Sequence, residues 1–222
     1  MAKRPPTREE LPAEGRITAI RPRPDGLRVR LVVDDVFRID VEPEAARAVS
    51  PGDPWTPETA EAMWRSAHFA SAKRRAMNTL GARAVSRGEL IKRLIRSGHD
   101  AEASERAADR MGELGLVNDE AFARSVASST VSGKPAGRRL VETKLRSKGI
   151  PAELARRVAD ETADSRDALA DAVSLARTRA ERMDPGLPRE TVYRRLTGLL
   201  ARRGFDAEVC REAVARVVKA DS

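Results

Sequence analysis

Lysine and arginine side chains recur at matching distances before three glycines, Gly98, Gly149 and Gly204, which lie 51 and 55 residues apart. Arg87 and Arg138 each stand eleven residues before a glycine, and other cations recur ten, five, two and one residues before pairs of these glycines. Guanidinium and ammonium groups bind phosphates and carboxylates. The chemistry that this spacing predicts is recognition of a polyanion or an acidic protein surface.

We call the predicted binding surface the basic stripe. It comprises fourteen residues: Arg87, Lys92, Arg93, Arg96, Lys134, Arg138, Arg139, Lys144, Arg146, Lys148, Arg194, Arg195, Arg202 and Arg203. The alternative interpretation is a set of solvated helix faces, because cations are favourable near helix C-termini. Solvation alone does not require a positive charge in the corresponding segment of all three repeats, which favours a binding surface.

The charge of the whole chain follows the same repeat. The chain of 222 residues has 42 Lys and Arg against 34 Asp and Glu, a net charge of +8. Residues 72–100, 121–150 and 173–204 carry +6, +6 and +5, whereas the segments after them carry −4, −3 and −1. If the repeats stack in similar orientation, their basic helices would form one continuous surface.

Catalysis is not expected. One cysteine, Cys210, and two histidines provide neither a disulfide nor a metal-ligand cluster, and no phosphate-binding loop is present because Pro135 follows Gly133-Lys134. We interpret His68 and His99 as structural and Cys210 as a buried thiol on an apolar helix face. The expectation is a protein without enzymatic activity, cofactor or metal.

Helices must position the basic stripe. Leucine or valine stands four and eight residues before each glycine, which is an apolar helical stripe ending at a glycine C-cap. A further helix start follows each glycine, with Asp100 and Asp206 as N-caps, and the segments 69–84, 119–131 and 167–183 predict a preceding helix. Ser86 and Glu89 form a capping-box pattern, and Pro135 and Pro188 mark later helix starts. The pattern predicts three tandem three-helix units.

The first part of the chain differs. Residues 16–21, 27–33 and 36–41 are rich in Val, Ile and Leu and alternate with charged residues, which predicts strands with one buried face, joined at Asp34-Asp35. Residues 1–71 carry a net charge of −1, so this part is not a source of the basic character. A linker helix should start at Thr56-Pro57.

The predicted fold is therefore mainly α, with three tandem helix-turn-helix-like units after a small β-rich segment. The expected boundaries are 1–55 for the β-rich segment, 56–118 for the linker helix and first unit, 119–166 for the second unit and 167–222 for the third.

Three stretches of the helical region carry a recognisable signature: Ser86-Arg87-Gly88-Glu89-Leu90-Ile91-Lys92-Arg93-Leu94 with Gly98, then Leu114-Gly115-Leu116-Val117-Asn118-Asp119-Glu120-Ala121-Phe122-Ala123, and the segment from Arg138 to Ile150. This signature resembles that of the RecX family, bacterial regulators of the recombinase RecA. The resemblance covers roughly residues 69–218. Asn118 stands where the family often has aspartate, and asparagine also caps helices well. The resemblance assigns no role to the β-rich segment, which we interpret as an added interaction module.

The resemblance implies a protein that binds in the groove of the RecA filament on DNA and modulates, most often inhibits, its recombinase, ATPase and co-protease activity in recombination and the SOS response. We expect a cytoplasmic monomer without a membrane partner, which binds single- or double-stranded DNA weakly and without sequence preference. The competing hypothesis is a sequence-specific helix-turn-helix repressor. A passive helical scaffold would leave the repeated basic pattern unexplained.

Overall fold

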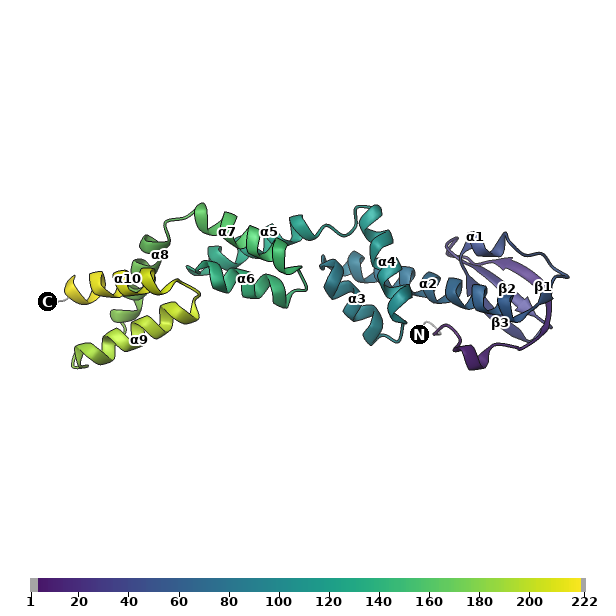
Figure 1. The fold of residues 1–222 in the computed structure, drawn as a ribbon, viewed down its shortest axis with the longest axis horizontal. Coiled ribbons are helices and arrows are strands. Elements are labelled where there is room, and N and C mark those ends of the chain that lie inside the picture. Colours follow the sequence, from purple (N-terminus) through teal and green to yellow (C-terminus); the bar gives the residue numbers. More distant parts are fainter. Residues whose placement is uncertain (1–3, 221–222) are drawn as a thin grey trace. The chain divides into compact units, whose positions relative to one another are not determined.

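The N-terminal part of the chain forms a small antiparallel sheet. The computed structural model describes residues 4–220 and contains β1 (Gly15–Pro22), β2 (Val29–Val33), β3 (Phe37–Val41) and β4 (Pro54–Trp55) in the order β3-β2-β1-β4 (Figure 1). The short helix α1 (Pro43–Ala46) lies between β3 and β4. The three predicted strands are confirmed, whereas the two-residue β4, which pairs with Gly15 and Arg16, was not predicted from the sequence.

The turn between β2 and β3 forms at Asp34-Asp35, as predicted. Both residues have positive φ angles, 48° and 58°, which is the conformation of the two central residues of a type I′ turn, whose twist suits a hairpin. Aspartate tolerates this conformation better than most residues. Asp34 also accepts a hydrogen bond of 2.9 Å from the Arg16 backbone N–H, which ties the turn to β1.

One face of the sheet packs against a long helix, α2 (Pro57–Ala82). Ile17, Leu31 and Ile39 are at most 1% exposed and belong to the same hydrophobic cluster as Met63 and Ala67 of α2. The sequence predicts a linker helix and a separate helix from residue 69, but the structure has a single helix, because no proline or glycine interrupts residues 58–80.

The remaining chain is helical, and the predicted three tandem repeats are confirmed. The first repeat contains α2, α3 (Arg87–Arg96) and α4 (Ala101–Glu113); the second contains α5 (Asp119–Gly133), α6 (Arg138–Ser147) and α7 (Ala152–Asp164); the third contains α8 (Ala168–Ala180), α9 (Arg189–Arg202) and α10 (Ala207–Ala220). Each repeat has its own hydrophobic cluster. The chain divides into two compact units, Met1–Val117 and Asn118–Ser222.

Side-chain caps start many of these helices. Ser86, Asp100 and Asn118 each accept a hydrogen bond from the backbone N–H three residues later, at 3.0, 2.9 and 2.9 Å. Pro188 directly precedes α9, as expected. Pro135 does not start α6, which begins at Arg138 with Gly137 as its N-cap.

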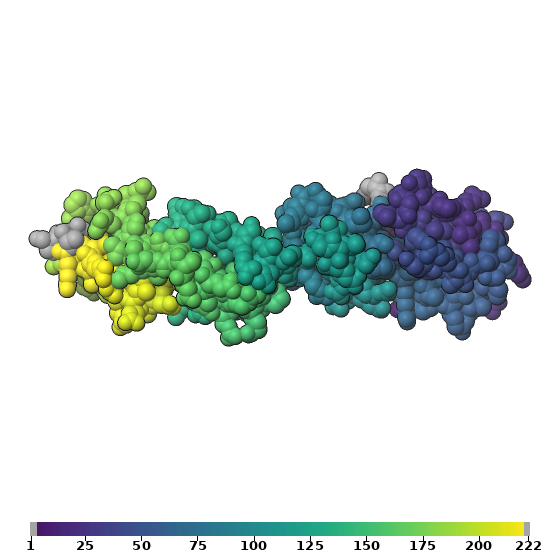
Figure 2. All heavy atoms as spheres, turned by 90° about the horizontal axis from the view of Figure 1, so that it is seen from above, coloured from purple at the N-terminus to yellow at the C-terminus, as the bar shows by residue number. Residues whose placement is uncertain are grey.

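The N-terminal residues are tied to α2. The carbonyl oxygen of Pro6 accepts a hydrogen bond of 3.0 Å from Trp64 Nε1, and Arg8 pairs with Glu61 at 2.9 Å. Figure 2 shows the purple N-terminal residues directly against the blue residues of the same unit. The β-rich segment and the first repeat are therefore packed as one compact unit.

Candidate binding surface

The second helix of each repeat ends in the same glycine turn. Gly98, Gly149 and Gly204 have φ angles of 90°, 81° and 81°. The residue after each glycine donates its backbone N–H to the carbonyl of the buried leucine that stands four residues before that glycine. The donor–acceptor distance is 3.2 Å in all three cases. Because these leucines point into the three cores, the basic residues of α3, α6 and α9 lie on the remaining faces.

Two arginines of the basic stripe make the same ion pair in successive repeats. Arg87 pairs with Asp109 at 2.7 Å, and Arg138 pairs with Asp160, in each case 22 residues further along the chain. The hydrogen bond to Asp160 raises the pKa of Arg138. Each pair links the first residue of a second helix to the third helix of the same repeat, so part of the role of both arginines is structural.

Four more stripe residues have partners within their own unit. Arg93 and Arg96 lie 2.7 and 3.4 Å from Glu89 of the same helix, and Arg139 lies 3.1 Å from Asp206. Arg203 donates to backbone carbonyls of residues 134 and 135, at 2.6 and 2.8 Å. Their positive charge is partly balanced inside the protein.

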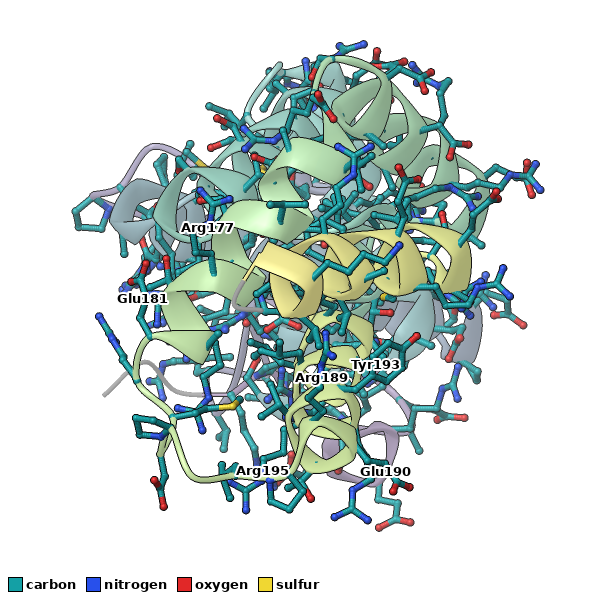
Figure 3. All side chains as sticks on the ribbon, turned by 90° about the vertical axis from the view of Figure 1, so that its left-hand side faces the viewer. Arg177, Glu181, Arg189, Glu190, Tyr193 and Arg195 are labelled. Carbon is teal, nitrogen blue, oxygen red and sulfur yellow. The ribbon has the colours of Figure 1, made fainter. Side chains whose placement is uncertain are left out.

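The remaining eight residues of the basic stripe are all exposed. Seven of them make no ion pair with any residue between 4 and 220: Lys92, Lys134, Lys144, Arg146, Arg194, Arg195 and Arg202. The eighth is Lys148. Figure 3 shows Arg195 and Tyr193 projecting from different sides of α9. Arg195 and Arg202 are seven residues apart and therefore share a face of that helix.

The second and third repeats meet at a joint made of backbone. The N–H groups of Gly137 and Arg139, at the start of α6, donate to the carbonyls of Arg203 and Gly204, at the end of α9, at 2.9 and 3.2 Å. A Cβ atom on Gly137 would overlap the carbonyl of Gly204. The joint brings Lys134, Arg139, Arg202 and Arg203 together from positions more than 60 residues apart. It pairs the positive end of one helix dipole with the negative end of another.

Sequence reasoning missed a group of arginines on the sheet. Five arginines lie in or beside β1–β3: Arg21, Arg23, Arg28, Arg30 and Arg38. They belong to a segment whose net charge of −1 indicated no basic surface. The net charge of a segment does not show on which side of the sheet its charged residues lie. Alternation along a strand does, because successive side chains point to opposite faces. The alternation of Arg28 and Arg30 with Leu27, Val29 and Leu31 was the signal that could have located them.

The histidines and the cysteine lie in structural positions. His68 is 7% exposed, with Nδ1 3.0 Å from Asp100 Oδ2 and Nε2 3.0 Å from the Pro6 carbonyl. Burial lowers the pKa of His99, and the neighbouring His68 lowers it further. Cys210 is 2% exposed, and burial raises the pKa of its thiol.

Between residues 4 and 220, no three His, Cys, Asp or Glu side chains gather as metal ligands would. Within the same range, every helix is too short or too polar to cross a bilayer.

Comparison with known proteins connects this arrangement to one family. The family model of the second three-helix domain of RecX matches residues 118–158. The regulatory protein RecX of Chlorobaculum tepidum is 34% identical over 154 residues, which cover 68% of this chain and 91% of the relative. The regulatory protein RecX of Corynebacterium efficiens is 33% identical over 153 residues, which cover 65% of this chain and 72% of the relative.

Solved structures agree on the fold. A crystal structure of regulatory protein RecX superposes with a TM-score of 0.67 at 18% identity and covers 88% of this chain and 96% of its own. RecX from Lactobacillus salivarius superposes with a TM-score of 0.57 at 17% identity, covering 68% and 96%. The relatives are named as regulators rather than as enzymes. By identity and coverage, the chain belongs to the RecX family of regulatory proteins.

Proposed function

We propose that this protein binds the RecA filament on DNA and inhibits its recombinase, ATPase and co-protease activity, acting in the cytoplasm as a monomer. Membership of a family of regulatory proteins supports a regulatory role. The observation that carries the proposal is the set of exposed cations without ion-pair partners on α3, α6 and α9, within residues 4–220. A filament of protein on DNA presents phosphates and carboxylates together, which suit this surface.

The mode of binding follows from the type of contact. Lysine and arginine contacts to phosphates carry no sequence information, so DNA alone is bound weakly, with strong salt dependence and little sequence preference. Discrimination in favour of the filament then comes from protein contacts. Binding across adjacent RecA subunits would disfavour their active arrangement, because a ligand shifts an equilibrium toward the state it binds better.

The test is the DNA-dependent ATPase rate of RecA with this protein titrated in at near-physiological salt, while DNA binding by this protein alone is measured in parallel. We expect ATPase activity to fall at amounts too small to coat the DNA. An unchanged ATPase rate together with tight binding to one duplex sequence would instead support a sequence-specific repressor.

The first variant reverses two accessible charges, Lys144→Glu on α6 and Arg195→Glu on α9. Arg138 and Arg139 are less informative targets because both have carboxylate partners whose loss would disturb packing. We expect roughly tenfold more of the double variant to be needed for the same inhibition, since about two phosphate-type contacts are lost.

The matched control is Arg182→Glu with Arg211→Glu. Both residues are exposed in the third repeat, outside the basic stripe, and form no ion pair with another residue between 4 and 220. The change in net charge is identical. Equal inhibition by the two folded variants would refute the proposed role of the stripe.

A further inference from the structure

The outer face of the N-terminal sheet carries a cluster of arginines. Register places Arg21 of β1 opposite Arg30 of β2, and Arg30 opposite Asp40 of β3. The neighbouring positions Leu31 and Ile39 face the opposite side, where they pack against α2. We name the outer side the arginine face, consisting of Arg21, Arg23, Arg28, Arg30 and Arg38.

Three guanidinium groups of the arginine face converge on one carboxylate. The oxygens of Asp40 lie 2.7 Å from Arg30 Nε, 3.2 Å from Arg28 Nη1 and 3.5 Å from Arg23 Nε. The side chains of Arg23 and Arg30 are 32% exposed and that of Arg28 is 16% exposed, so all three are held partly against the protein. These guanidinium groups are ordered around an anion before any ligand arrives.

The positive charge exceeds what the local carboxylates balance. Asp25 and Asp40 are the carboxylates that pair with arginines of this cluster among residues 4–220, which leaves a charge of +3 on these seven residues. Glu10, which lies nearby, pairs with Arg4. Arg21 and Arg38 are exposed and have no ion-pair partner among the described residues, and the buried Nε of Arg23 makes no hydrogen bond. Like charges directly opposite in a sheet are destabilising. Unused donors and uncompensated charge both favour an external anion.

A groove of about 440 Å³ lies next to these groups, beside the edge strand β3. Its charged lining consists of four arginines and two carboxylates, Arg4, Arg28, Arg30, Arg38, Glu10 and Asp40. Its apolar lining includes Pro5, Pro6, Val36 and Phe37. Val36 is 77% exposed, so its side chain is accessible to a ligand in the groove. The groove therefore combines guanidinium donors with an apolar wall.

We propose that the arginine face and its groove bind single-stranded DNA. A phosphodiester chain supplies regularly spaced negative charges. Such a chain suits arginines that lie on three neighbouring strands, because the strands are about 4.8 Å apart. The apolar wall accepts the flat face of a base, which a single strand leaves accessible and a duplex does not. An acidic peptide would satisfy the arginines but leave this wall without a function.

The experiment measures binding of a fluorescent oligothymidylate to the full chain without RecA, so its outcome is independent of the proposed action on RecA. For Arg21→Glu with Arg38→Glu we expect roughly tenfold weaker binding at about 0.1 M salt, and a log–log salt slope shallower by about 1.4, because two phosphate contacts are lost. The Arg182→Glu, Arg211→Glu protein is the charge-matched control and should change the affinity less than about twofold, since exposed charges are screened beyond roughly 10 Å.

A second variant should change the affinity for oligothymidylate in the opposite direction. Asp40→Asn removes the carboxylate that occupies three guanidinium groups, so oligothymidylate should bind more tightly while the melting temperature falls. Three results would each overturn the proposal. They are equal affinity for the folded wild-type and Arg21→Glu, Arg38→Glu proteins, stronger binding of polyglutamate than of oligothymidylate, and a preference for duplex over single strands.

Discussion

At the residue scale, the buried histidine of the glycine turn gives the N-terminal unit a pH dependence. His99 is 9% exposed and follows Gly98, facing His68, Asp100, Arg74 and Arg75. Burial lowers its pKa in the folded chain below the ordinary value of 6.5. Above that value both the folded and unfolded chains carry a neutral ring. As the pH falls, the unfolded chain takes up a proton first, so stability is lost as the pH falls through the folded pKa.

We therefore expect the thermal unfolding temperature to fall when the pH is lowered from about 7 to about 5.5, and His99→Gln to reduce this slope because it removes the titrating ring. The measurement is differential scanning calorimetry at several pH values. An identical slope in the folded His99→Gln protein would show that other groups cause the pH dependence.

At the element scale, the joint between α6 and α9 depends on the missing side chain of Gly137. The φ angle of Gly137 is −79°, which any residue adopts, so alanine at this position adds a steric overlap with Gly204 and no backbone strain. Relief of that overlap requires α6 and α9 to separate, with loss of two backbone hydrogen bonds. At about 1 kcal/mol each, these bonds are worth about 2 kcal/mol.

Gly137→Ala should consequently destabilise the joint by about 2 kcal/mol, and amide hydrogen exchange at Gly137 and Arg139 reports it directly. Gly98→Ala is the matched comparison. That position has a φ of 90° with open space around it, so only conformational strain of about 1–2 kcal/mol is added. Unchanged exchange at Arg139 in the Gly137→Ala protein would be incompatible with a tight joint.

At the scale of the whole molecule, the β-rich segment is not a separable addition to the helical repeats. Its core is completed by Ala60, Met63 and Ala67 of α2, the helix that continues into the first repeat. Trp64 and His68 also lose their shared acceptor, the Pro6 carbonyl, if the segment is removed. Exposed apolar helix faces favour aggregation.

Deletion of residues 1–55 should therefore lower the melting temperature and increase binding of a hydrophobic dye such as ANS, because Met63 and its neighbours become exposed. Circular dichroism and ANS fluorescence of the truncated chain check this. A truncated protein with full helix content and no dye binding would establish that the segment is independent. Point variants of the arginine face are thus better probes of its function than truncation.

Local physics made much of this architecture predictable from sequence. Leucines four residues before Gly98, Gly149 and Gly204 define the core side of the second helices, and the glycines end them, because both effects act within a few residues. The same is true of the strands, the Asp34-Asp35 turn, and the caps at Ser86 and Asp100. The order of signature residues in the first and second repeats predicted the family.

What only the tertiary structure decided is how charges distant in sequence meet. Repeat spacing and segment charge predicted one surface of fourteen cations, but Asp160 and Asp206 pair with Arg138 and Arg139, and Arg203 donates to backbone carbonyls of the second repeat. The joint at Gly137 and the arginine face of the sheet were equally hidden. Helix and strand periodicities specify which side of an element is buried, whereas the partner of an exposed charge depends on the packing of other elements against it.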